Sequence, residues 1–165
     1  MGSSVIILMG VAGAGKTTVG RQLARHMNWQ FCDGDALHPQ SNIDKIQCGI
    51  PLTDDDRRPW LACIHESLVE WIAHGERVVL ACSLLKEAYR AYVLNGHRDK
   101  VYLVYLKASP ALLKLRLIKR PGHFMGATLL TSQFEILEEP ADALVVDASQ
   151  TPETIIRMVQ SVLHA

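Results

Sequence analysis

Short runs of consecutive apolar residues alternate along the chain with longer segments whose apolar positions recur at helical spacing. The apolar runs cover residues 5–9, 29–32, 78–83, 101–106 and 143–147. The helical segments lie at residues 17–27, 41–48, 59–74, 86–94, 110–120, 128–137 and 152–163. Strands that are apolar on both faces and alternate with helices are typical of a parallel sheet covered on both sides. The pattern predicts one α/β domain over residues 1–165.

Prolines and glycines mark the ends of the predicted helices. Prolines are expected at helix starts, at Pro59, Pro110 and Pro152. Glycines are expected just after helix ends, at Gly49, Gly75 and Gly96. No linker rich in Gly, Ser or Pro divides the chain, and the segments 35–75 and 116–140 are interpreted as helical inserts.

Composition narrows the class of protein. The formal net charge is zero and 48% of residues are apolar, so neither nucleic acid nor a membrane surface is expected as a partner. The four cysteines form no C-x-x-C pair, which argues against a zinc or redox site and favours a reduced, cytoplasmic protein. The N-terminal apolar run is too short to span a membrane and has no signal-peptide pattern.

The first apolar run leads into GVAGAGKT, which matches the Walker A phosphate loop G-x-x-x-x-G-K-[ST] between a strand and a helix. Lys16 is expected to reach the β- and γ-phosphates of ATP, and the Thr17 hydroxyl to ligate Mg²⁺. The residues expected to bind the nucleotide are Gly10, Val11, Ala12, Gly13, Ala14, Gly15, Lys16, Thr17 and Thr18. The alternatives are a tightly packed glycine turn and a dinucleotide fingerprint, whose third glycine position holds Thr18.

Two carboxylates, Asp33 and Asp35, follow the second apolar run in the segment DGD. The carboxyl end of a parallel strand is where α/β sheets place their sites, so both are expected near the phosphate loop. Phosphoryl transfer needs one carboxylate near Mg²⁺ and another to orient the attacking hydroxyl. The alternative is an exposed turn in which Asp35 caps a helix.

Arginines mark two further segments. In DDDRRPWL, helix-dipole complementation explains Asp54 and Asp55 but not Arg57 and Arg58, so a guanidinium there is a candidate clamp for a carboxylate or phosphate. In RLIKRPGHFM, Arg116 and Arg120 lie four residues apart and are candidates for neutralising transition-state charge. The alternative for both arginines is a solvated helix face, and His123 either contacts substrate or caps a turn.

These segments together resemble the gluconokinase family of small P-loop kinases, which phosphorylate D-gluconate on its 6-hydroxyl with ATP. The likeness covers about residues 5 to 147 and rests on MGVAGAGKTTVG, DGDALHPQSNIDKIQCGIPLTDDDRRPWL, ACSLLKEAYR, YLVYLKAS, RLIKRPGHFM and LLTSQFEILEEP. The resemblance implies a P-loop NTPase of the nucleoside-monophosphate-kinase-like type. It also implies a five-stranded parallel sheet, a substrate-binding insert near 35–75, a lid near 116–140, ATP and Mg²⁺ as requirements, and a homodimer.

The resemblance also implies roles for individual residues. The catalytic residues would be Lys16, Asp35 and Arg120, and the metal would be held by Thr17 and Asp33. The gluconate contacts would be Asp35, His38, Arg57, Lys86, Arg90 and His123. Arg116 and Arg120 would close over the phosphates. The activity would feed sugar-acid breakdown through the pentose phosphate or Entner–Doudoroff routes.

The chain departs from the family pattern at Leu84, Ala91 and Ile46. Ala91 replaces an aspartate and puts the expected contacts of Lys86 and Arg90 in question. Three rival functions remain: a kinase of the same fold for a related sugar acid, shikimate or a nucleoside monophosphate, a regulatory GTPase, and a non-catalytic ATP-binding module. A GTPase would carry N-K-x-D and D-x-x-G segments, which the chain lacks, and a non-catalytic module is expected to lose Lys16 or the aspartates.

Overall fold

A computed structural model describes residues 4–119 and 127–164, and in it the five apolar runs form one parallel sheet. The strands are β1 (Val5–Met9), β2 (Gln30–Asp33), β3 (Val78–Ala81), β4 (Val101–Lys107) and β5 (Leu144–Asp147). Their order across the sheet is β2-β3-β1-β4-β5, and every neighbouring pair is parallel. The predicted fold class is confirmed, and β1 lies at the centre of the sheet, so the loop that follows it opens at the middle of one sheet edge.

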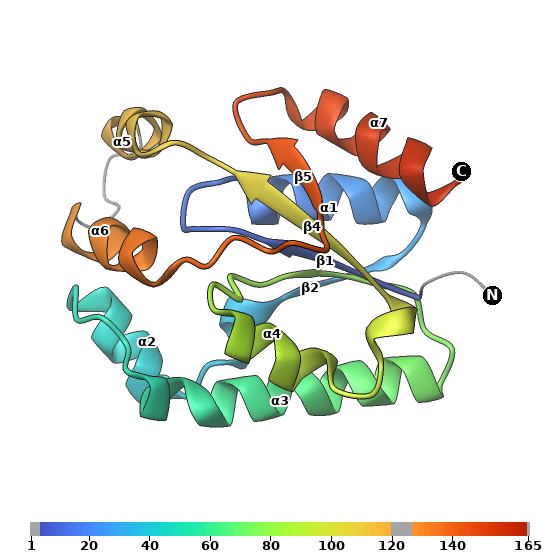
Figure 1. Cartoon of the computed structure of the whole chain (residues 1–165), viewed down its shortest axis with the longest axis horizontal. Helices are drawn as coiled ribbons and strands as arrows, with labels where there is room; N and C mark the ends of the chain where they lie inside the picture. Colours follow the sequence, from blue (N-terminus) through green and yellow to red (C-terminus); the bar gives the residue numbers. More distant parts are fainter. Residues whose placement is uncertain (1–3, 120–126, 165) are drawn as a thin grey trace.

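The helices cover both faces of this sheet. They are α1 (Lys16–Met27), α2 (Gln40–Gln47), α3 (Asp54–Ala73), α4 (Glu87–Leu94), α5 (Pro110–Ile118), α6 (Ala127–Ile136) and α7 (Pro152–Leu163), with short 3₁₀ turns η1 (Gly34–Leu37) and η2 (Arg98–Lys100). Helices α1 and α7 lie on one face of the sheet, and α3 and α4 on the other (Figure 1). Helices α2, α5 and α6 gather at the end of the molecule opposite the two termini (Figure 1).

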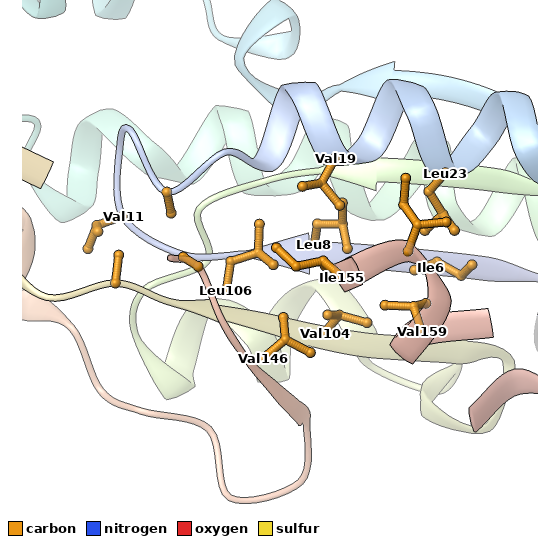
Figure 2. Packing of buried hydrophobic residues seen from close by; sticks show 14 of the residues in the cluster. Ile6, Leu8, Val11, Val19, Leu23, Val104, Leu106, Val146, Ile155 and Val159 are labelled. Atoms are coloured by element: carbon orange, nitrogen blue, oxygen red, sulfur yellow. The ribbon is translucent and has the colours of Figure 1, made fainter. Parts of the chain in front are cut away.

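The core consists of two apolar layers, one on each face of the sheet. Figure 2 shows the first layer, where Leu8 and Val104 of the strands meet Val19 and Leu23 of α1 and Ile155 of α7. The alternate strand positions face the second layer. That layer contains Val5, Ile7, Met9, Trp60, Ile64 and Leu68. Burial of each large side chain contributes roughly 1.5–3 kcal/mol, which explains why the strands are apolar at consecutive positions.

One helix start differs from the sequence expectation. Helix α3 begins at Asp54, so Pro59 lies inside the helix and the predicted start at Pro59 is wrong. The Thr53 side chain accepts from the backbone N–H of Asp56, and the Asp56 carboxylate accepts from the N–H of Thr53. This capping box fixes the start, and Pro59 is tolerated near it because Asp55, four residues earlier, is exposed and water can hydrate its carbonyl.

The other boundaries agree with the sequence expectation to within two residues. Gly49, Gly75 and Gly96 follow helix ends with positive φ, as predicted. Among the described residues, no helix is both long enough and apolar enough to cross a membrane.

Candidate active site

The loop between β1 and α1 has the backbone of a phosphate loop. Gly10 has φ +151°, and a Cβ there would lie 2.8 Å from the carbonyl oxygen of Leu106 on the neighbouring strand. Gly15 has φ +101° and stands directly before α1. Only glycine takes both positions without strain, and the loop curls tightly into the N-terminus of α1, where backbone N–H groups without helical partners can receive an anion. This geometry fits a chain of phosphates.

Lys16 folds back over this loop. Its Nζ donates to the carbonyl oxygens of Gly10 and Val11, both at 2.9 Å. Loss of hydration lowers the pKa of Lys16, and the negative charge of Asp35 opposes the shift most strongly. The ammonium therefore lies at the mouth of the loop beside the carboxylates that follow β2.

Asp33 and Asp35 lie on either side of a tight turn at the end of β2. The Asp33 carboxylate accepts from the backbone N–H of Asp35 at 3.0 Å, so Asp33 is the cap, contrary to the alternative that assigned the cap to Asp35. A Cβ at Gly34 would lie 2.8 Å from the carbonyl oxygen of Ala81, which explains the glycine between the aspartates. Loss of hydration raises the pKa of Asp35; Lys16 opposes this shift and Asp33 adds to it. A raised pKa makes the Asp35 carboxylate a better proton acceptor than an ordinary aspartate.

A cavity of about 510 Å³ joins the phosphate loop to the insert. Its polar lining includes Lys16, Asp33, Asp35, His38 and Arg57. Its apolar lining comes from α2, the segment after α2, and Trp60 of α3. The size and the mixture of a few polar groups with apolar walls are typical of small-molecule sites.

His38 is held in one orientation on the cavity wall. Its ring stacks on Trp60 with centroids 4.2 Å apart, and Trp60 Nε1 donates to the carbonyl oxygen of Gly34 at 2.8 Å. Asn42 Nδ2 lies 3.1 Å from His38 Nδ1 and donates to the carbonyl oxygen of Asp56 at 2.7 Å, so this amide is the donor and His38 Nδ1 accepts. Burial, followed by the nearby charge of Arg57, lowers the pKa of His38 to about 4. His38 is therefore neutral at pH 7 and carries its proton on Nε2.

Arg57 supplies a positive charge to the cavity. Its Nη1 donates to the carbonyl oxygen of Leu52 at 2.8 Å and to the Tyr89 hydroxyl at 3.2 Å. The Tyr89 hydroxyl in turn donates to Asp54, which pairs with Lys86 at 3.1 Å. The guanidinium is mostly buried and keeps donors for a bound anion, since two contacts do not exhaust its five N–H groups.

Arg90 does not reach the cavity, so the structure does not support the expected contact with gluconate. It is 3% exposed, and its Nη1 donates to the carbonyl oxygens of Leu84 and Leu85. Its Nη2 donates to Glu87 and to the carbonyl oxygen of Glu138. The guanidinium is used to join the loop after β3 to the segment after α6. Lys86 does not line the cavity either and instead pairs with Asp54.

The three residues that depart from the family pattern lie in different surroundings. Leu84 is fully buried with φ +42°. Ile46 lines the cavity. Ala91 is exposed on α4, and Arg90 takes its carboxylate contact from Glu87 instead. The missing aspartate at position 91 therefore leaves Arg90 held in place.

Arg116 contacts the phosphate loop from α5. Its Nη1 donates to the carbonyl oxygen of Gly13 at 2.9 Å, and its Nη2 donates to the carbonyl oxygen of Ala148 at 2.5 Å, in the loop after β5. The guanidinium thus bridges two loops at the same edge of the sheet. Arg120 and His123, the other two residues expected from this segment, lie outside the described residues.

The cavity is also lined by residues that the sequence does not indicate as site residues, among them Trp60, Tyr89 and Gln133. Trp60 and Tyr89 are positioned by long-range packing, for which local periodicity carries no signal. Gln133 belongs to α6, 121 residues along the chain from the loop that it contacts.

Two relatives and one solved structure that are similar to this chain are gluconokinases. A family model described as an AAA domain matches residues 5–140. A gluconokinase of Gluconobacter oxydans is 44% identical over 154 residues, covering 92% of this chain and 86% of that protein. The thermoresistant gluconokinase of Escherichia coli is 38% identical over 156 residues, covering 92% and 89%. The crystal structure of a gluconokinase from Sinorhizobium meliloti superposes with a TM-score of 0.87 at 43% identity, covering 99% of this chain and 91% of that one.

Proposed function

The chain belongs to the gluconokinase family of P-loop kinases, and on this premise we propose that it phosphorylates D-gluconate. ATP supplies the γ-phosphoryl group, the 6-hydroxyl accepts it, and the products are 6-phospho-D-gluconate and ADP. The observation that carries the proposal is one cavity that contains Lys16 of the phosphate loop, the carboxylate of Asp35 and the guanidinium of Arg57.

Asp35 acts as the base in this proposal. Its carboxylate takes the proton of the 6-hydroxyl as the oxygen attacks the γ-phosphorus and the bond to the ADP oxygen breaks. The raised pKa supports this role because a more basic carboxylate accepts the proton more readily. Lys16 leaves the carbonyl oxygens of Gly10 and Val11 and stabilises the negative charge on the phosphates.

Arg57 and His38 bind the acid in this proposal. Arg57 places a positive charge in the same cavity as Asp35, which suits the carboxylate of gluconate at the end opposite its 6-hydroxyl. His38 is neutral with a proton on Nε2, so it donates to a hydroxyl without adding charge. With Arg57 at the carboxylate and Asp35 at the 6-hydroxyl, the direction in which the chain of hydroxyls enters the cavity is fixed.

The donor set fits Mg²⁺. No cluster of three or more His, Cys, Asp or Glu side chains that could hold a metal is found in residues 4–119 and 127–164. Mg²⁺ in kinases is typically held by one or two protein oxygens together with phosphates and water, and the Thr17 hydroxyl and Asp33 carboxylate are such oxygens. When bound, the ion neutralises charge on the β- and γ-phosphates. One oxygen of Asp33 accepts from the N–H of Asp35, and among the described residues no hydrogen bond or ion pair engages the other.

The rest of the assignment rests on the family resemblance. We propose that Arg116 and Arg120 close over the phosphates and that His123 contacts the acid. We also propose that segment 35–75 binds substrate and segment 116–140 acts as a lid. We further propose that the protein forms a homodimer and acts in the cytoplasm.

An acceptor panel tests the function. ADP release is measured with ATP and Mg²⁺ against gluconate, other aldonates, shikimate and nucleoside monophosphates. The proposal expects the largest kcat/KM with gluconate. A higher value with another sugar acid or with shikimate would replace gluconate as the substrate and retain the kinase. ADP release without any dependence on the acceptor would contradict both.

A further inference from the structure

One side chain of α6 contacts the phosphate loop directly. The backbone N–H of Ala12 donates to Gln133 Oε1 at 2.7 Å. Both residues line the cavity that contains Lys16 and Asp35. The contact therefore lies in the cavity in which the proposed function brings the γ-phosphoryl group and the incoming hydroxyl together.

The orientation of the Gln133 amide follows from its partner. A backbone N–H can only donate, so the oxygen of the carboxamide faces Ala12 and the NH₂ group is directed elsewhere. Among the described residues no acceptor is bonded to that NH₂ group. Two N–H donors therefore remain for a ligand in the cavity.

Helix α6 is held in place on both sides of Gln133. Leu130 is 5% exposed and belongs to the same apolar layer as Leu8 and Val104, and Phe134 packs against that layer. After the helix, the N–H of Glu138 donates to the carbonyl oxygen of Leu85 at 2.8 Å. The amide is thus presented from a packed element, which is how a positioned donor is built.

We propose that Gln133 is a catalytic residue of the kinase, in which Nε2 donates to an oxygen of the γ-phosphoryl group during transfer. The inference rests on the proposed function. Transfer spreads negative charge over the phosphoryl oxygens, and a donor fixed in advance stabilises that charge without reorganisation. The Ala12 N–H fixes the oxygen of the amide, so its NH₂ group is oriented whenever this part of the proposed lid lies against the phosphate loop, as it does in the structure.

Two substitutions separate this role from a structural one. Gln133→Glu keeps an oxygen that accepts from Ala12 but removes both N–H donors. Gln133→Met removes the donors without adding charge. The inference expects both variants to lose kcat by about 10²-fold, the typical worth of one positioned donor. KM for gluconate and for ATP should change little. The matched control is Gln160→Glu on α7, which adds the same charge outside the cavity and should retain wild-type kcat.

The outcomes are distinguishable. Wild-type kcat in Gln133→Glu would show that only the oxygen that accepts from Ala12 is needed, as for an anchor of α6, and would overturn the inference. Wild-type kcat in Gln133→Met, or a loss confined to KM for ATP, overturns it as well. Should one variant not fold, as judged by circular dichroism, the folded one decides. Failure of the wild-type protein to phosphorylate gluconate would instead contradict the proposed function.

Discussion

At the scale of single residues, the site separates two carboxylates that are close in sequence. Asp33 is fixed by the N–H of Asp35, whereas Asp35 faces Lys16 and has a raised pKa. In the proposed function, this turn supplies Asp33 for the metal and Asp35 for the proton. Their different environments predict different responses to the same substitution.

Asp35→Asn should lower kcat with gluconate by roughly 10²–10⁴-fold, because the amide cannot accept the proton. In the wild type, activity should fall as pH drops through the raised pKa of Asp35, since a protonated carboxyl is no base. That acid limb should be absent from the residual activity of the variant. A pH series of kcat measures both effects.

Asp33→Asn is the matched comparison. It should shift the Mg²⁺ dependence of the rate, because a weakened partner loosens the ion. Full turnover in Asp35→Asn, together with a loss in Asp33→Asn at unchanged Mg²⁺ dependence, would reverse the two roles.

Arg57→Met should raise KM for gluconate while kcat changes less. A hydrogen bond to a charged group contributes about 1.5–3 kcal/mol, which corresponds to roughly a 10- to 150-fold rise. Arg58→Met is the control, because Arg58 is 78% exposed and pairs only with the equally exposed Asp55 among the described residues. Equal KM values in the two variants would remove Arg57 from the substrate site.

At the scale of elements, the sequence predicts those strands and turns whose formation depends on residues close together in the chain. The apolar runs identify the strands because both faces of a parallel sheet are covered, and the glycines of the phosphate loop identify the turn after β1. The expected start of α3 at Pro59 is wrong because the capping box formed by Thr53 and Asp56, and not the proline, sets the start of the helix. That signal was present in the segment TDDD, with aspartate in the position that glutamate more often occupies.

The role of Arg90 could not be predicted in this way. Its partners include the carbonyl oxygens of Leu84 and of Glu138, and the second of these is 48 residues away. The pairing of a loop with the segment after α6 depends on how α4 and α6 are placed in space. Gln133 was missed for the same reason, since its contact with Ala12 crosses most of the chain.

Arg90→Met should destabilise the protein by roughly 1–3 kcal/mol, because carbonyl oxygens near the core lose their donor. Arg90→Lys should not restore stability, since one ammonium cannot replace a planar guanidinium that donates both to the loop after β3 and to the segment after α6. Thermal unfolding measures the loss, with Arg58→Met as the exposed control. A melting temperature equal to that of the control would contradict the anchoring role.

At the scale of the whole molecule, the fold brings distant segments to one sheet edge. The phosphate loop follows the central strand β1, the two aspartates follow β2, and Ser83 of the cavity follows β3. Helices α2 and α6 lie at this end of the molecule, away from the termini (Figure 1). The net charge is zero, yet Lys16 and Arg57 face Asp33 and Asp35 within one cavity. This arrangement suits transfer between an anionic nucleotide and an anionic acid.

The central claim is that the 6-hydroxyl of gluconate accepts the γ-phosphoryl group in this cavity. Its most direct test is phosphorus–proton NMR of the product formed from ATP and gluconate, with the Lys16→Ala variant as the control. The account predicts one new phosphate monoester coupled to the two protons on C6, formed in equal amount to ADP, and at least about 10²-fold slower formation in the variant. A phosphate on another carbon, or the same product formed by Lys16→Ala at the wild-type rate, would contradict it.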